Sequence, residues 1–147
     1  MAENSNPRTN FASGSLWEPL RGYSRAVRVG DSLFISGTTA TDAAGEVIGV
    51  GDPYEQTKYV IRTVNHILRE AGFKPTDLVR TRLFVTDMTK WKDYARAHRE
   101  AYEKIRPASS IVQVTKLVDP RLMIEMEAEA IFGAGPAENV KIEYPDQ

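Results

Sequence analysis

The segment from Arg106 to Phe132 constrains the fold of this chain more than any other stretch. Its first half, around Ile111 to Leu117, is rich in the β-branched and aliphatic residues that favour strands. Residues 118–121 include an aspartate and a proline, which favour a turn and interrupt a sheet. Apolar residues and glutamates then alternate from residue 124 to residue 130, as in a strand with two different faces. The segment therefore predicts two strands joined by a short turn.

Three glutamates, Glu125, Glu127 and Glu129, share one face of the second predicted strand. Like charges in register on a strand repel one another, so this face must meet water, cations or a polar pocket. The pattern alone leaves two interpretations open, a solvated sheet face and the wall of a binding pocket.

Two further stretches upstream also predict strands. Residues 26–29 and 32–36 flank Gly30-Asp31, and glycine tolerates the positive φ of a tight hairpin turn. Gly37, directly after this hairpin, indicates a position where the backbone approaches another group closely. Residues 78–85 predict another strand, with alternating faces.

Two amphipathic helices are predicted between these strands. The first is capped by Asp52, has Pro53 at its first position and runs to about Ala71. The second begins near residue 87 or 89 and runs to about residue 105, with His98 inside its apolar stripe. The order of elements predicts an α+β domain of two layers, a mixed sheet with both helices on one face.

The chain has 147 residues, enough for one domain with a single core. We expect a flexible N-terminal arm over residues 1–21, the domain over residues 22–132 and a polar C-terminal tail over residues 133–147. No apolar run approaches the ~20 residues of a transmembrane helix, and the polar N-terminus lacks the apolar core of a signal peptide. The expected protein is therefore cytoplasmic and does not bind membranes.

Several chemistries lack the residues they need. The sequence has no cysteine, which excludes disulfides, thiolate metal sites and cysteine nucleophiles. Its two histidines have no metal-binding spacing, so we expect no metal and no cofactor. The net charge is −1 and the arginines are interspersed with acids, which argues against nucleic acid as a partner.

Short motifs spread over residues 22–131 give the clearest functional signal. They are Gly22-Tyr23-Ser24, Leu33-Phe34-Ile35-Ser36-Gly37, Gly45-Glu46-Val47, Gln56-Thr57, Ala71-Gly72, Phe84-Val85-Thr86-Asp87, Arg106-Pro107-Ala108 and Ile124-Glu125-Met126-Glu127-Ala128. In this order and spacing the chain resembles the RidA family, also called YjgF or L-PSP. The resemblance implies a chorismate-mutase-like α+β fold and a homotrimer that binds small molecules in clefts between subunits. It also implies hydrolysis of reactive enamines and imines of amino acids to keto acids and ammonia, and some members have been called endoribonucleases.

The resemblance places Tyr23, Ser36 and Glu125 in the pocket. Each also has a structural interpretation: Tyr23 as a packing aromatic, Ser36 as a hydroxyl near a turn and Glu125 as one acid of a solvated face. The residue after Pro107-Ala108 is Ser109, where the family's deaminases carry an arginine that clamps the substrate carboxylate. A serine offers one neutral hydrogen bond where a guanidinium offers a charged, bidentate pair. A pocket asparagine of some members is also replaced, at about Ala95. We therefore expect an altered substrate preference.

Two kinds of residue are candidates to compensate for Ser109. An arginine at position 28, 82, 106 or 121 is one candidate. The other is His98, as a new polar group in a rebuilt pocket, although a histidine in an apolar stripe is more often a satisfied core residue. If His98 paired with Glu125, the two side chains would form a proton-transfer couple.

Three functions stay open on the sequence. The first is a deaminase-type hydrolase with Glu125 and His98 as catalytic residues and Tyr23, Ser36 and Ser109 as substrate-binding residues. The second is a trimer that binds a small metabolite without turning it over. The third is a ribonuclease, for which the sequence offers no evident basic track.

Overall fold

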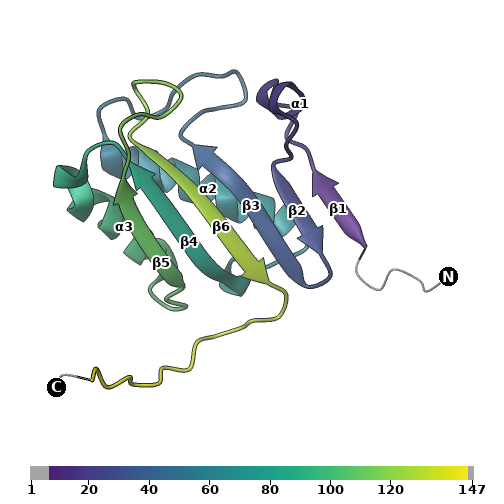
Figure 1. Cartoon of the computed structure of the whole chain (residues 1–147), viewed down its shortest axis with the longest axis vertical. Helices are drawn as coiled ribbons and strands as arrows, with labels where there is room; N and C mark the ends of the chain where they lie inside the picture. Colours follow the sequence, from purple (N-terminus) through teal and green to yellow (C-terminus); the bar gives the residue numbers. More distant parts are fainter. Residues whose placement is uncertain (1–6, 146–147) are drawn as a thin grey trace.

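The computed structural model describes residues 7–145 and contains a six-stranded mixed sheet with two long helices on one face (Figure 1). The strands are β1 (Arg8–Phe11), β2 (Ala26–Val29), β3 (Ser32–Thr39), β4 (Leu78–Val85), β5 (Ala108–Gln113) and β6 (Ile124–Ile131). The helices are α1 (Trp17–Arg21), α2 (Pro53–Glu70) and α3 (Trp91–Tyr102), with short 3-10 turns η1 (Pro75–Asp77) and η2 (Met88–Lys90). The strand order is β1-β2-β3-β6-β4-β5, and among these neighbours only β4 and β5 are parallel. The predicted two-layer α+β architecture is confirmed.

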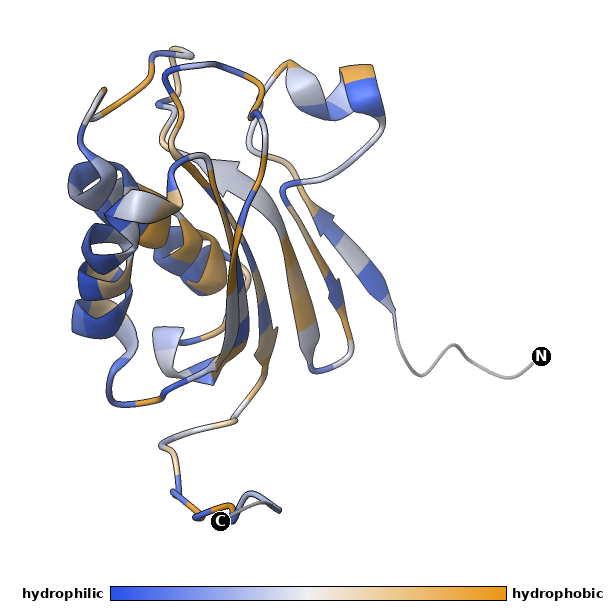
Figure 2. Cartoon of the chain, turned by 60° about the vertical axis from the view of Figure 1, so that its left-hand side comes forward, coloured by the Kyte–Doolittle hydropathy of each residue, from blue (hydrophilic) through white to orange (hydrophobic). Residues whose placement is uncertain are grey.

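Helix α2 forms where the sequence predicted it. The side chain of Asp52 accepts a hydrogen bond from the backbone N–H of Glu55 at 3.0 Å, and Pro53 occupies the first turn. Its apolar stripe, which includes Val60, Val64 and Leu68, is fully buried against the sheet. Figure 2 shows the apolar sides of α2 and α3 turned toward the strands, so the core lies between the two layers.

The predicted hairpin is confirmed as β2 and β3, with Gly30 in the left-handed region at a φ of 57°. Beyond the hairpin, β3 continues to Thr39 along β6, but its register shifts between Ile35 and Thr38. This irregularity gives β3 a bulge at Ser36-Gly37, a feature that re-aims side chains locally.

The last two predicted strands are present, but the connection between them is longer than the expected short turn and they are not neighbours in the sheet. The first of them, β5, begins earlier than expected and ends at Gln113, and β4 lies between β5 and β6. The physical reason is burial. Every side chain of β5 is exposed, which suits an edge strand, whereas Ile124, Met126, Ala128 and Ala130 of β6 are buried, which suits a central one.

Two elements within the predicted flexible arm were missed, namely β1 and α1. Strand β1 pairs with β2 from Arg8 opposite Val29 to Phe11 opposite Ala26. Its short polar sequence lacks the alternation that would predict a strand. Pairing with β2 therefore determines its conformation. Residues 1–6 of the predicted arm and residues 146–147 of the predicted tail lie outside the described residues, and the division into arm, domain and tail stays a prediction. No helix within residues 7–145 is long and apolar enough to cross a membrane.

Candidate functional site

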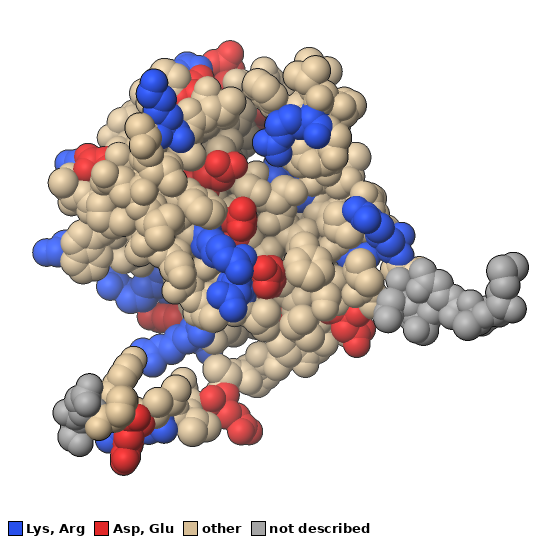
Figure 3. Space-filling view, viewed as in Figure 1, with Lys and Arg blue, Asp and Glu red and all other residues tan. Residues whose placement is uncertain are grey.

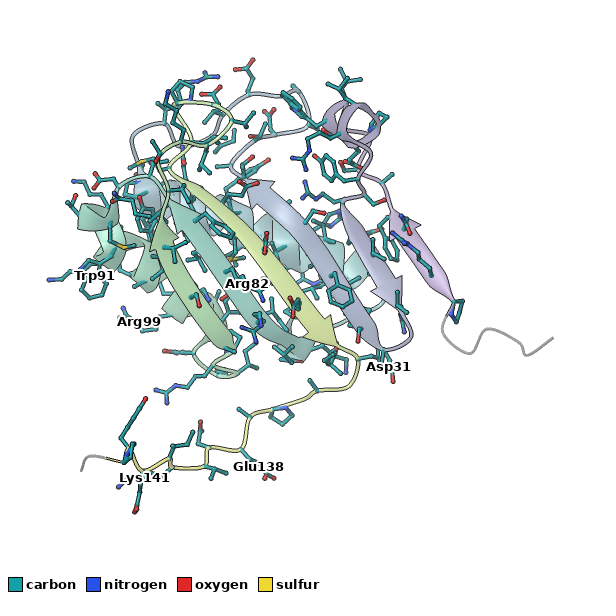
Figure 4. All side chains as sticks on the ribbon, viewed as in Figure 1. Asp31, Arg82, Trp91, Arg99, Glu138 and Lys141 are labelled. Carbon is teal, nitrogen blue, oxygen red and sulfur yellow. The ribbon has the colours of Figure 1, made fainter. Side chains whose placement is uncertain are left out.

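The face of the sheet opposite α2 and α3 carries the three glutamates of β6, and two of them have arginine partners. Arg82 of β4 lies 2.9 Å from Glu129 and 3.7 Å from Glu127, and Arg80 lies 3.7 Å from Glu129. Arg82 is visible over the middle of this open face in Figure 4, and Figure 3 shows basic and acidic side chains meeting there. Among the described residues, Glu125 has no ion pair, so it differs from its two neighbours on the strand.

The carboxylate of Glu125 lies directly against Gly37. A Cβ built at Gly37 would stand 2.4 Å from Oε1 of Glu125 and 2.9 Å from its Cδ, so only glycine leaves room for this side chain. The close approach predicted at Gly37 is therefore confirmed. Partial burial raises the pKa of Glu125, opposed by the positive charge of Arg25 and reinforced by the negative charge of Glu127.

Tyr23 and Ser36 lie near Arg25. The guanidinium of Arg21 stacks 4.3 Å from the centre of the Tyr23 ring, and that of Arg25 lies 6.0 Å from it. Ser36 donates its hydroxyl to the backbone carbonyl of Ser24 at 2.6 Å, while Arg25 donates from Nη2 to the carbonyl of Gly37. Tyr23, Ser36 and Glu125 thus lie around one half-buried arginine next to the bulge of β3.

His98 and Ser109 form a second group, joined by Thr81. The Oγ1 of Thr81 lies 2.8 Å from Nε2 of His98 and 2.8 Å from Oγ of Ser109. Thr81 is fully buried on the helix-covered face of β4, and burial lowers the pKa of His98. A lowered pKa keeps the imidazole neutral, as expected of a histidine held inside a fold.

The two groups do not meet within one protomer. Glu125 projects from the open face, whereas Thr81 holds His98 and Ser109 on the helix-covered face. The register places Glu125 opposite Phe84 and Ser109 opposite Thr81, two strands away, a backbone separation of about 14 Å from strand spacing and rise. Within one protomer the sheet separates His98 from Glu125, so a proton-transfer couple between them would need two subunits and stays a prediction.

The arginines proposed to replace the one missing at Ser109 mostly have other partners. Arg28 donates to the carbonyls of Gly30 and Ala71 and packs on two phenylalanine rings. Arg121 pairs with Asp119 at 2.9 Å, and Arg82 is held by the glutamates of β6. Arg25 lies in no motif and was not predicted from the sequence. Its position directly after Tyr23-Ser24 was the one signal that could have identified it as a candidate site residue.

Hollows of the protomer surface lie along α3, away from Glu125. One, of about 240 Å³, is lined by His98, Arg99, Tyr102, Glu103, Arg106 and Pro107. The other, of about 380 Å³, is lined by Trp91, Lys92, Asp93, Ala95, Arg96 and Arg99. Both are open to solvent, and Trp91 and Arg99 project outward in Figure 4. Within residues 7–145, no three histidine or acidic side chains cluster closely enough to hold a metal ion.

Comparisons with known proteins agree with the fold and cover the region that carries both groups. A family model described as Endoribonuclease L-PSP matches residues 15–132. An uncharacterised protein of Streptomyces coelicolor is 37% identical over 123 residues, which cover 83% of this chain and 90% of that protein. The 3-aminoacrylate deaminase RutC of Acinetobacter baylyi is 34% identical over 115 residues, which cover 76% of this chain and 88% of that protein. The crystal structure of a YjgF/YER057c/UK114 family member from Mycobacterium tuberculosis is similar with a TM-score of 0.76 and 41% identity, covering 85% of this chain and 99% of that one.

Proposed function

Because the chain belongs to the RidA family, also called YjgF or L-PSP, we propose that it hydrolyses reactive enamine or imine intermediates with an altered substrate preference. The observation that carries this proposal is the state of Glu125. Its carboxylate is partly buried, lies against Gly37 and has a pKa that burial raises. A carboxyl group of this kind exchanges a proton more readily near neutral pH than an exposed one does.

The chemistry needs one group that both gives and takes a proton. An enamine is first protonated on carbon to give the iminium ion, and the proton comes from the neutral carboxyl of Glu125. Water then adds to the iminium carbon while the Glu125 carboxylate takes a proton from it. Glu125 then gives this proton to the nitrogen of the carbinolamine, and its carboxylate takes the hydroxyl proton as the C–N bond breaks and ammonia and a carbonyl product leave. Glu125 ends in its starting state, so the net reaction consumes one water and releases one ammonia.

The site is proposed to lie between subunits of a homotrimer. One fact supports this: the two groups of predicted site residues lie on opposite faces of one protomer. Only a second copy can place the Ser109 group opposite the Glu125 group. In this arrangement Glu125 is the catalytic residue, Tyr23 and Ser36 bind substrate, and His98 positions Ser109 through Thr81.

The exposed edge of the sheet supports self-association. Strand β5 is exposed along its whole length, and Ile111 and Val112 on it are 38% and 45% exposed. On the open face, Phe34 is 49% exposed. An unpaired, apolar edge of this kind is normally covered by another segment or chain. A second copy of this chain is long enough to cover β5 and has polar groups to pair with its backbone. Light scattering of the purified protein at micromolar concentration should give the mass of three chains, and a stable monomer would refute the intersubunit site.

A non-catalytic metabolite-binding trimer is the second candidate. It is favoured by Ser109, whose hydroxyl is bound to Thr81 and cannot replace a charged clamp. Ribonuclease activity is the weaker alternative, because the arginines of the open face are paired with glutamates and form no free basic track. A cytoplasmic location remains a prediction.

Ammonia release separates these functions. Freshly generated 2-iminopropanoate, 3-aminoacrylate and larger 2-imino acids are mixed with the protein, and ammonia is measured against the spontaneous rate. A hydrolase accelerates release from at least one of them. Binding of the corresponding stable keto acids with no acceleration would instead identify a metabolite-binding protein.

A further inference from the structure

Arg25 is a half-buried cation that the proposed site leaves unexplained. It directly precedes β2, and its Nη2 donates to the carbonyl of Gly37. Its Nε is covered from solvent and has no hydrogen-bond partner among the described residues. Buried polar atoms in proteins are almost always bonded, so an unbonded nitrogen on a guanidinium indicates a missing partner.

No carboxylate of the described residues forms an ion pair with this guanidinium. Glu18 and Glu125 are near enough to favour its positive charge, but Glu18 is held by the backbone N–H and hydroxyl of Ser13. Glu125 lies against Gly37, whose carbonyl Arg25 binds. The cation and the carboxylate therefore flank the same residue without pairing, so no ion pair within the described residues neutralises Arg25.

We infer that Arg25 is the anion anchor of the site and binds the carboxylate of a small 2-imino or 2-oxo acid. This inference rests on the proposed function and names the group that takes over from the arginine absent at Ser109. A carboxylate accepts two parallel hydrogen bonds from one guanidinium, and burial strengthens such a pair. A carboxylate bound by Arg25 would bring its substrate next to Gly37, whose carbonyl Arg25 binds and against which Glu125 lies. The anchor and the proton donor thus come from one bulge of β3 and the residues beside it.

Binding of a matched pair of probes tests the anchor without requiring turnover. Pyruvate and its neutral analogue pyruvamide have nearly the same shape and differ in the charge that Arg25 would recognise. By calorimetry, the wild type should bind pyruvate at least about tenfold more tightly than pyruvamide. Arg25→Gln retains a donor for the carbonyl of Gly37, removes the charge, and should lower the preference to about one while leaving affinity for pyruvamide unchanged.

Arg82→Gln is the matched control, since Arg82 is also an arginine on this side of the sheet but is paired with Glu127 and Glu129. It should keep the preference of the wild type. If Arg25→Gln does not fold, Arg25→Lys decides: it keeps the charge, loses the planar fork and should weaken the preference at least about threefold.

The inference is overturned if the wild type does not distinguish the two probes, or if the folded Arg25 variant keeps the full preference for pyruvate. Failure of the proposed function is detected by a different measurement, ammonia release. In that case the wild type releases no ammonia from any imine, whatever the two probes show about Arg25.

Discussion

Replacing Gly37 with alanine is expected to remove function while leaving the fold intact. The new Cβ would lie 2.4 Å from Oε1 of Glu125, whereas ordinary contact begins at about 3.4 Å, so the carboxylate must move by about 1 Å. A displacement of that size at a reacting group costs on the order of a hundredfold in rate. The stability change should stay within about 1 kcal/mol, because the contact is with the end of a flexible side chain and Gly37 has no positive φ.

Two measurements check this expectation. Ammonia release from 2-iminopropanoate reports the rate, and urea unfolding reports the free energy of unfolding. Glu125→Asp shortens the side chain by one methylene, so Gly37→Ala should have little further effect in that background, a non-additive pair. Full activity of Gly37→Ala, or equal effects of alanine in both backgrounds, would show that the position of Glu125 over Gly37 is irrelevant to turnover.

Three further changes probe the rest of the site. Ser109→Arg should leave imine hydrolysis unchanged if Arg25 anchors the substrate, and a clear rise in rate would show that the site lacks an anchor. His98→Asn should lower the free energy of unfolding by about 1–3 kcal/mol through the lost bond to Thr81 and keep most of the activity of the folded protein, whereas lost activity at unchanged stability would make His98 catalytic. Because burial raises the pKa of Glu125 above its ordinary 4.5, the folded state binds that proton more tightly than the unfolded chain does. Wild type should therefore lose stability relative to Glu125→Gln as the pH rises above 4.5 toward the raised pKa. Urea titrations at about pH 4 and about pH 8 measure this difference. Equal differences at the two pH values would show that burial does not raise the pKa of Glu125.

Local signals predicted the elements of this fold well. The cap at Asp52, the glycine turn after Val29 and the alternation of β6 each depend on contacts a few residues apart, so they can be read without knowing the rest of the chain. The order of strands was harder. The sequence places β5 and β6 next to each other, and only the burial of β6 on its helix-covered face, set by distant strands, puts β4 between them.

The candidate site was predicted in part for the same reason. Glu125 and Gly37 stand in motifs, and the structure brings them together across β3 and β6. The apolar stripe of α3 turned His98 toward the sheet, but its contact with Thr81 depends on how α3 packs over β4, which no pattern within α3 encodes. Arg25 was missed because its role depends on a bulge in the neighbouring strand, a feature set by register and not by the residues beside the arginine.

The most direct test of the proposed function compares two glutamates on the same strand. Glu125→Gln and Glu127→Gln make the same chemical change on the same face of β6, but Glu127 is paired with Arg82 and Glu125 lies against Gly37. Ammonia release from the best imine substrate is measured for both variants and the wild type at neutral pH. Glu125→Gln should lower the rate at least about a hundredfold, the lower end of the usual contribution of a general acid–base group, and Glu127→Gln should leave it nearly unchanged. Equal rates for the two variants would contradict the role given to Glu125.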